Sequence, residues 1–294
     1  MNDAHCHFFS SSFFATLARD VKDAPSDPGV ELPRRLGWDP PGDDAALADR
    51  WVTELDRHGV ARAAIIASVP GDEGSVAAAA GRHPSRFVGF FMINPAAHDA
   101  EPRAERALGE LGLRAACLFP AMHQYRLDDE RVEKVVARAD AHGAAVFVHC
   151  GVLSVGVRRK LGLPSRFDLR LGDPLAVASL ALRHSAVPFI IPHFGAGLLR
   201  EALMAADAAP NVYLDTSSSN AWTRYHPGLT LAAAFRQALE VAGASRLLFG
   251  TDSSFFPRGW QRGVYDAQLA ALDELRVDDA SRAAILGTNF DRLF

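Results

Sequence analysis

Short apolar runs recur along the whole chain, and each is followed by a stretch rich in Ala, Leu and Arg. Residues 63–67, Ala-Ala-Ile-Ile-Ala, are apolar at every position, as in a strand buried on both faces of a parallel sheet. We predict strands at eight runs of this kind: Asp3–Phe8, Ala61–Val69, Phe87–Ile93, Ala115–Phe119, Ala144–His149, Phe189–His193, Val212–Thr216 and Leu247–Asp252.

Helical stretches lie between the predicted strands. Gly59, Gly112, Gly143 and Gly243 stand where helices are expected to stop, since glycine suits the backbone at a helix C-terminus. The eight predicted helices are Asp44–His58, Ser75–His83, Glu101–Leu111, Asp129–His142, Pro174–His184, Gly197–Ala208, Leu229–Val241 and Gly259–Leu275. Eight strand–helix units close a (β/α)8 TIM barrel, an α/β fold. No composition break divides the chain, so we expect a single domain over residues 1–294.

Three connections are longer than the usual few residues. They cover residues 10–43, 150–172 and 217–227, and they follow the first, fifth and seventh predicted strands. In such barrels the connections after strands carry the active site. We therefore expect insertions at these three places, with Phe13–Arg19 forming a short helix in the first.

Composition excludes several classes of partner. The formal net charge of −4 gives no reason to expect binding to nucleic acid or to an anionic membrane. No apolar run approaches the ~20 residues that span a bilayer, and no leader precedes the first predicted strand. Three cysteines are too few for a disulfide framework. We expect a cytoplasmic protein with a small-molecule substrate, and the Ala-rich helix at Leu199–Ala209 leaves a homo-oligomer open.

Candidate chemistry begins with His5 and His7. On a strand, residues two apart point to the same face, so both rings can reach one metal ion, while Cys6 points away. His149, His193 and Asp252 each end a predicted strand after a run of apolar residues. A titratable group at such a position is costly unless it is bonded or used. In a barrel these strand ends converge on one mouth.

With these residues the chain resembles the amidohydrolase superfamily, and in particular its amidohydrolase-2 branch, to which the aminocarboxymuconate-semialdehyde decarboxylases are related. The resemblance covers nearly the whole chain. It implies that His5, His7, His149 and Asp252 hold one divalent metal ion, with zinc favoured over manganese, iron and cobalt. It also implies that His193 is a catalytic acid or base, and that Asp252 can accept a proton as well as bind the metal.

Binuclear members of that superfamily use a carboxylated lysine at the end of the fourth strand. This chain has three lysines, Lys22, Lys134 and Lys160, and none stands there. We therefore expect a mononuclear site.

Other residues near predicted strand ends are candidates for substrate binding: His123, Trp222, His226 and Asn94. Asp215 either orients His193 or caps its strand. His58, His83, His142 and His184 lie at predicted helix C-termini, where bonding to the last carbonyl groups explains them.

Two enzymatic functions fit these residues. The leading hypothesis is hydrolysis of an amide, ester or lactone bond in a small organic molecule by a metal-activated water. The alternative is non-oxidative decarboxylation of an aromatic or unsaturated carboxylic acid. That reaction needs a cation for the carboxylate, which Arg158, Arg159, Arg166 or Arg170 could supply. A barrel that binds a ligand without turnover, or a metal-free lactonase, is the third alternative.

Overall fold

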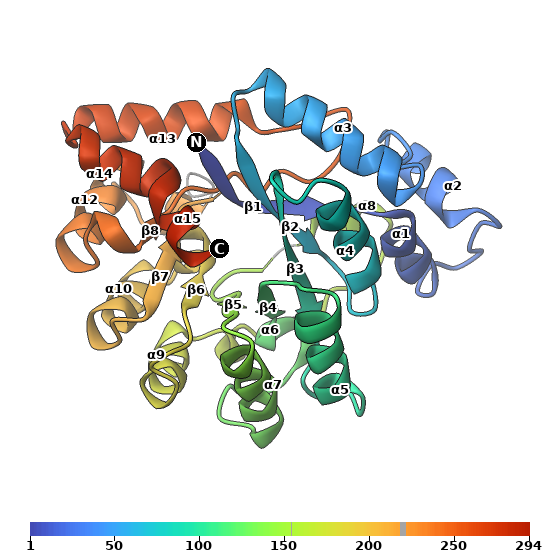
Figure 1. The fold of residues 1–294 in the computed structure, drawn as a ribbon, viewed down its shortest axis with the longest axis horizontal. Coiled ribbons are helices and arrows are strands. Elements are labelled where there is room, and N and C mark those ends of the chain that lie inside the picture. The colour runs from blue at the N-terminus through green and yellow to red at the C-terminus, as the bar shows by residue number, and fades with distance from the viewer. Residues whose placement is uncertain (154, 218–221) are drawn as a thin grey trace.

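The computed structural model describes residues 1–153, 155–217 and 222–294 of the chain. Its strands form one parallel sheet in the order of the sequence (Figure 1). They are β1 (Asn2–Phe8), β2 (Arg62–Ala67), β3 (Phe87–Ile93), β4 (Ala115–Leu118), β5 (Ala145–Val148), β6 (Phe189–Ile191), β7 (Val212–Asp215) and β8 (Leu247–Leu248).

The sheet closes on itself between β1 and the segment that follows β8. The amide of Ala4 donates to the carbonyl of Phe249 at 2.8 Å, the amide of Asp252 donates to the carbonyl of His5 at 2.8 Å, and Cys6 forms a parallel bridge with Ser253. The predicted (β/α)8 barrel is confirmed. Because closure places Asp252 beside His5, two candidate ligands from opposite ends of the chain become neighbours.

Helices surround the barrel on its outside (Figure 1). The connection after β1 holds α1 (Ser11–Ala18), α2 (Pro28–Arg35) and α3 (Asp44–Arg57), so the short helix predicted there exists. The connection after β5 holds α8 (Gly156–Lys160) and α9 (Pro174–Arg183). The other α-helices of the described residues are α4 (Glu73–Arg82), α5 (Ala100–Glu105), α6 (Pro120–His123), α7 (Glu130–Ala141), α10 (Leu199–Ala208), α12 (Leu231–Val241), α13 (Arg262–Glu274), α14 (Asp279–Ala283) and α15 (Asn289–Leu293).

Alternating side chains of the strands build two apolar layers. Phe90, Phe147 and Ile190 point into the barrel, whereas Phe91 and Phe189 pack outward against the helices. All five are at most 1% exposed, and full burial of each side chain stabilises the fold by about 1.5–3 kcal/mol. Cys6 lies in the outer layer, as expected from its place between His5 and His7.

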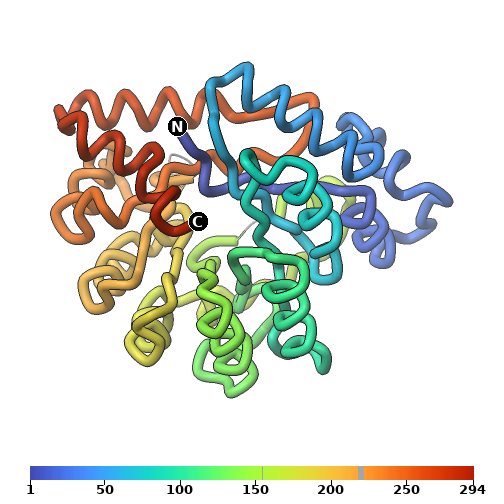
Figure 2. The backbone as a smooth tube through the Cα atoms, viewed as in Figure 1, coloured from blue at the N-terminus to red at the C-terminus, as the bar shows by residue number. Residues whose placement is uncertain are grey.

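The C-terminal helix α15 closes one end of the barrel. Phe290 belongs to the interior cluster, and the ring of Phe294 lies 5.0 Å from that of Phe90. The tube view shows this last helix over the centre of the barrel, near the start of β1 (Figure 2). The open mouth of the barrel therefore lies on the opposite face, where the strands end.

Several predicted strands end earlier than the sequence suggested, and at β6 and β8 the early end concerns candidate site residues. β6 stops at Ile191 because Pro192 lacks an amide hydrogen and His193 adopts φ +57°. β8 contains two residues, and Asp252 also has φ +57°. Both candidate catalytic residues thus stand on left-handed backbone just beyond a strand, where such strain is typical of functional sites.

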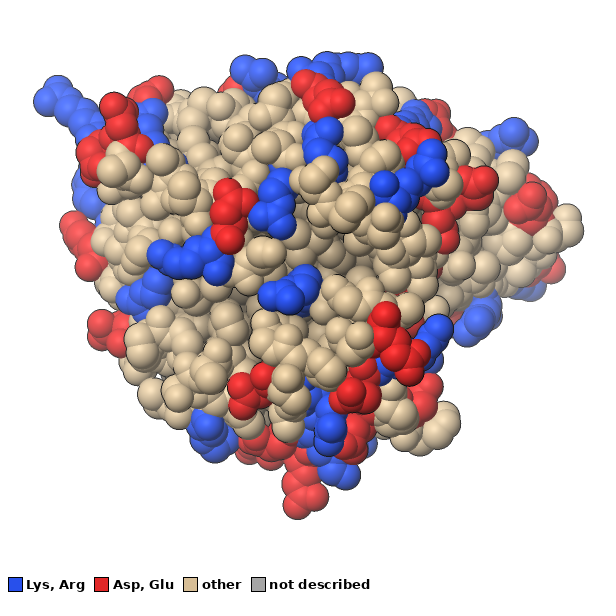
Figure 3. All heavy atoms as spheres, viewed as in Figure 1, with Lys and Arg blue, Asp and Glu red and all other residues tan. Residues whose placement is uncertain are grey.

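The face in Figure 3 carries both signs of charge interspersed around a large uncharged area. Within the described residues, none of the helices is long and apolar enough to cross a bilayer.

Candidate metal centre and active site

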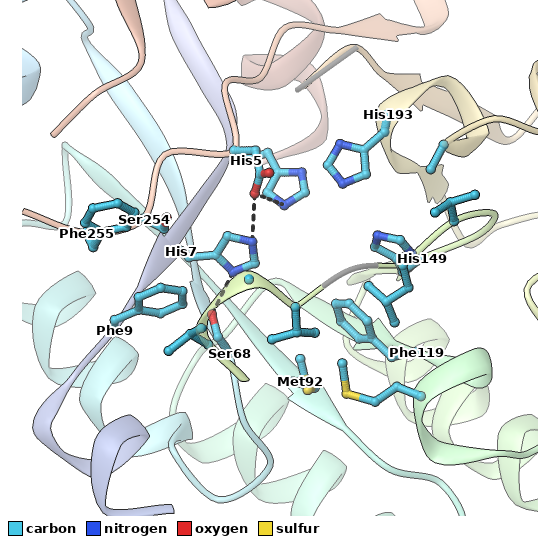
Figure 4. A pocket seen from close by; sticks show the side chains of 18 of the residues that line it. His5, His7, Phe9, Ser68, Met92, Phe119, His149, His193, Ser254 and Phe255 are labelled. Carbon is cyan, nitrogen blue, oxygen red and sulfur yellow. Dashed lines mark hydrogen bonds and ion pairs between the residues drawn. The ribbon is translucent and has the colours of Figure 1, made fainter. Parts of the chain in front are cut away.

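His5, His7 and Asp252 form a cluster at the mouth of the barrel, and their ligand atoms lie within 4.8 Å of one another. Asp252 Oδ1 is 2.9 Å from Nε2 of His7 and 3.7 Å from Nε2 of His5. The rings of His5 and His7 lie side by side at this cavity, with His193 next to His5 (Figure 4). Two ligands bonded to one metal ion at about 2.0–2.2 Å lie at comparable separations.

The ring of His5 is held by a carboxylate behind it. Nδ1 of His5 donates to Asp215 Oδ2 at 2.7 Å, and both side chains are buried. Since Nδ1 carries the hydrogen in the neutral ring, Nε2 presents its lone pair to the cluster. A carboxylate behind a histidine fixes the tautomer and makes the ring a stronger ligand.

The ring of His7 is held by Ser68 in the same way. Ser68 Oγ lies 2.7 Å from Nδ1 of His7 and 3.0 Å from the carbonyl oxygen of Ile66. Nε2 of His7 faces a carboxylate oxygen of Asp252 at 2.9 Å. Imidazole nitrogens and a carboxylate oxygen that face one another are the donor set of a divalent metal site, so the residues present fit a metal ion.

The pKa values agree with a cation site. Burial alone would raise the pKa of Asp252, but the hydrogen bond and charge of His7 hold it far below its usual range. Burial lowers the pKa of His7. Burial also acts to lower the pKa of His5, yet the charges of Asp215 and Asp252 raise it above its usual value. The negative charge that favours a proton on His5 favours a metal ion in the same place.

His193 lies next to this cluster without belonging to it. Its ring centroid is 5.0 Å from that of His5, and its Nδ1 donates to the backbone carbonyl of Ser217 at 2.8 Å. Burial lowers the pKa of His193, and the charge of His5 lowers it further. In the neutral ring, Nε2 carries the lone pair that can accept a proton at the site.

Ser217 connects the two histidines. Its hydroxyl donates to Asp215 Oδ2 at 2.9 Å and lies 2.9 Å from Nδ1 of both His5 and His193. Asp215 therefore orients His5 directly, and it reaches His193 through Ser217. From the sequence, we expected Asp215 either to orient His193 or to cap its strand. In the structure its direct histidine partner is His5.

His149 is near the cluster but outside the group of three. It is 6% exposed, its ring lies 5.2 Å from that of His193, and it stacks on Phe119. Burial lowers its pKa well below the usual value, so the ring is neutral and suited to bind a metal. Its Nδ1 atom is buried without a hydrogen-bond partner among the described residues. Its place as the fourth ligand stays a prediction.

The predicted substrate-binding residues separate into different places. Trp222 lines the cavity above the cluster, and its indole Nε1 is buried with no partner within the described part of the chain. His226 packs against Trp222 and bonds to the carbonyl of Gly197 at 2.9 Å. Asn94 accepts from the amide of Ala96 at 3.0 Å and so caps its own turn. His123 lines a second cavity, described below.

The cavity at the cluster has a volume of about 550 Å³ and a largely aromatic wall. Its aromatic residues are Phe9, Phe13, Trp38, Phe119, Trp222, Tyr225 and Phe255. Three cations also line it: Lys160, Arg224 and Arg258. Such a wall suits a flat, apolar molecule with a negative group.

Arg258 is a site residue that the sequence reasoning missed. Its guanidinium donates to the carbonyl of Asp252 at 3.3 Å and to Ser254 Oγ at 2.6 Å. Its position on the connection after β8, six residues beyond Asp252, is the signal that could have found it. The arginines proposed after the fifth strand lie elsewhere: Arg158 pairs with Asp20, and Arg170 pairs with Asp168.

The profile of the amidohydrolase family (Amidohydro_2) matches residues 2–294, nearly the whole chain. The chain belongs to the amidohydrolase-2 family. The resemblance drawn from His-x-His, Pro-His-Phe-Gly and Gly-Thr-Asp is thereby confirmed. No curated protein matches the amidohydrolase described here in sequence.

Solved structures share its fold at low identity. A 5-carboxyvanillate decarboxylase from Novosphingobium aromaticivorans, complexed with manganese and 4-hydroxy-3-methoxy-5-nitrobenzoic acid, is 14% identical with a TM-score of 0.63, covering 99% of this chain and 94% of that one. A probable 2-pyrone-4,6-dicarboxylic acid hydrolase from Acinetobacter baumannii, with citric acid bound, is 14% identical with a TM-score of 0.61, covering 99% and 98%. An amidohydrolase from Burkholderia multivorans with bound zinc is 18% identical with a TM-score of 0.64, covering 99% and 98%.

Proposed function

We propose that this amidohydrolase is a metal-dependent hydrolase that cleaves an amide, ester or lactone bond in a small organic molecule. The observation that carries the proposal is the hydrogen bond from His193 Nδ1 to the Ser217 carbonyl, 2.8 Å long. In the neutral imidazole, Nε2 is therefore unprotonated, and the ring lies beside the His5–His7–Asp252 cluster. Hydrolysis needs such a base to take a proton from water, whereas decarboxylation needs an acid to deliver one to carbon.

One divalent ion, with zinc favoured, would be held by His5, His7 and Asp252, with His149 as the fourth ligand. Zinc in one similar structure and manganese in another support a divalent metal in this fold. When bound, such an ion lowers the pKa of a water toward about 7 and polarises a carbonyl group.

The protein's own groups then handle protons and water. His193 accepts a proton at Nε2 and returns it to the leaving group, while Ser217 and the Asp215 behind it keep the ring in place. Asp252, with its pKa far below the usual range, stays ionised as a metal ligand and is a weaker proton acceptor than His193. The aromatic wall excludes bulk water and holds the body of the substrate, with the free indole N–H of Trp222 available as a donor.

Decarboxylation is the second candidate, and Arg258 favours it. This guanidinium bonds to the backbone of Asp252, so a fixed cation stands beside the metal cluster. A substrate carboxylate could pair with it there. The similar fold of a 5-carboxyvanillate decarboxylase is compatible with this alternative.

One experiment separates the two candidates. Protein purified without chelators is analysed for metal, then incubated with a panel of lactones, esters, amides and aromatic carboxylates in heavy-oxygen water. Hydrolysis transfers heavy oxygen into the product carboxylate and releases no carbon dioxide. If carbon dioxide is released and the organic product contains no heavy oxygen, the reaction is decarboxylation and the hydrolase proposal is wrong.

A further inference from the structure

A second cavity adjoins the metal centre. It has a volume of about 450 Å³ and lies between α1 and the connection that follows β5. Neither the proposed metal ligands nor His193 line it. Most of its lining residues belong to the connections after β1 and β5. Such connections can vary without disturbing the barrel and often carry binding residues.

The two cavities share a wall. Six residues line both: Phe13, Ser68, Met92, Met122, Val155 and Val157. Ser68 links this wall to the metal centre, because its hydroxyl oxygen lies within hydrogen-bonding distance of Nδ1 of His7, at 2.7 Å. A molecule that fills both cavities therefore passes one side chain away from a proposed ligand. Methionine side chains on the shared wall can adjust their shape to such a molecule.

The polar groups of the second cavity leave one positive charge uncompensated. Arg158 pairs with Asp20 at 2.9 Å and also donates to the carbonyl of Pro164 at 3.0 Å. Arg166, in contrast, stands exposed at the edge of the cavity, and its guanidinium has no hydrogen-bond or ion-pair partner among the residues that the structure describes. Burial keeps His123 neutral by lowering its pKa to about 4, and its Nδ1 atom is also unpartnered in the described chain. The cavity thus offers one free cation and one neutral imidazole.

Much of the remaining wall is apolar, and Thr16, Ser68, Gln124 and Ser165 are its uncharged polar residues. Phe13, Leu17, Val69, Val155 and Phe167 all line the second cavity. A mainly apolar wall with one unpaired guanidinium suits a carboxylate at the end of an apolar segment. It suits a phosphate less well, because a phosphate carries up to two negative charges and the guanidinium would neutralise only one of them.

We propose that the second cavity binds the distal end of the substrate, and that Arg166 pairs with a carboxylate on that end. The inference rests on the proposed function only in taking the metal centre as the reaction site. The substrate class is then an acid whose carboxylate is separated from the reacting carbonyl by an apolar segment. Such a molecule places its reacting group beside His7 and its carboxylate beside Arg166.

The test is a binding measurement that needs no turnover. Zinc-loaded protein is titrated calorimetrically with the linear dicarboxylates from succinate to suberate and with the linear monocarboxylate of each chain length, none of which has a bond to hydrolyse. We expect the longer dicarboxylates to bind about two- to fivefold more tightly than the monocarboxylates of the same length, as one charge-assisted pair at an exposed site would give. The shortest should show no such difference, because it cannot span both cavities.

Arg166→Gln should abolish this preference for the second carboxylate and leave the affinity of the monocarboxylates, whose one carboxylate binds the zinc ion, unchanged. Arg170→Gln is the matched control, since Arg170 is exposed like Arg166 but pairs with Asp168 and does not line the second cavity. A preference that survives in Arg166→Gln, or that is missing from the wild-type protein at every length, overturns the proposal. Failure of the hydrolase proposal shows instead as absent heavy-oxygen incorporation, which these binding curves do not involve.

Discussion

Nδ1 of His5 lies 2.7 Å from a carboxylate oxygen of Asp215, a residue 210 positions further along the chain. The barrel brings the two together because closure places β1 beside β8, which is paired with β7. This contact fixes which nitrogen of His5 faces the metal centre. It is the support on which the orientation of the ligand cluster depends.

Asp215→Asn should weaken metal binding by about 10–100-fold, because a neutral amide makes His5 a poorer ligand than a carboxylate does. Competitive zinc titration against a chromophoric chelator measures the change. Asp207→Asn, at an exposed position on α10, is the control and should bind zinc as the wild type does. Equal affinities in all three proteins would show that Asp215 does not support the metal centre.

His193→Asn should keep the metal and lose activity by roughly 10²–10⁴-fold, the usual range for a general acid or base. Metal content and kcat are measured on the same preparation, with a substrate from the panel above. His98→Asn, at an exposed histidine, should change neither quantity. Parallel loss of metal and activity would make His193 a ligand, and unchanged kcat would remove it from the mechanism.

Gly250→Ala should disturb the packing of Asp215 against His5. A Cβ at this position would lie 2.7 Å from Asp215 Oδ1 and 3.0 Å from Cβ of His5, so the support of His5 must shift. We expect a loss of about 1–3 kcal/mol in unfolding free energy, as for other overpacked sites, together with weaker zinc binding.

Gly263→Ala is the matched control for that variant. Gly263 lies in α13, and a Cβ there meets nothing within 4 Å. Alanine should stabilise the helix by about 0.5–1 kcal/mol. Urea unfolding of both variants compares them, and a Gly250→Ala protein as stable as the control would refute the close packing behind His5.

His123 should make the protein sensitive to acid. Burial lowers its pKa to about 4 in the folded chain, whereas an unfolded chain has an ordinary pKa near about 6.5. Between these values the unfolded state binds a proton that the folded state does not. The stability from neutral His123 is therefore complete above about pH 6.5 and is lost as the pH falls towards about 4, by roughly 3 kcal/mol at most.

His123→Gln should remove this contribution. The loss of unfolding free energy between about pH 7.5 and about pH 4.5, measured by urea titration, should be smaller in the variant than in the wild type. His98→Gln removes an exposed histidine instead and should retain the wild-type loss. An equal acid loss in His123→Gln and the wild type would contradict the assignment of a depressed pKa to this residue.

The sequence alone determined the barrel and the residues at its mouth. Apolar runs separated by helical stretches predict β/α units through local physics, and strand ends such as His149, His193 and Asp252 interrupt those runs with costly polar groups. His5 and His7 were readable because a strand repeats every two residues. Where β6 and β8 stop was less readable, since left-handed backbone at His193 and Asp252 is stabilised by surrounding contacts that no local pattern encodes.

Only the tertiary structure decided how these residues act together. Asp215 pairs with His5, Ser68 with His7, and Ser217 joins His5 to His193, and each partner is distant in sequence. Arg258 and the shared wall of the two cavities likewise depend on how the connections after strands fold over the barrel. The reason is physical: hydrogen-bond partners and cavity walls are set by closure of the sheet and by packing between distant segments, whereas periodicity reports only the local chain.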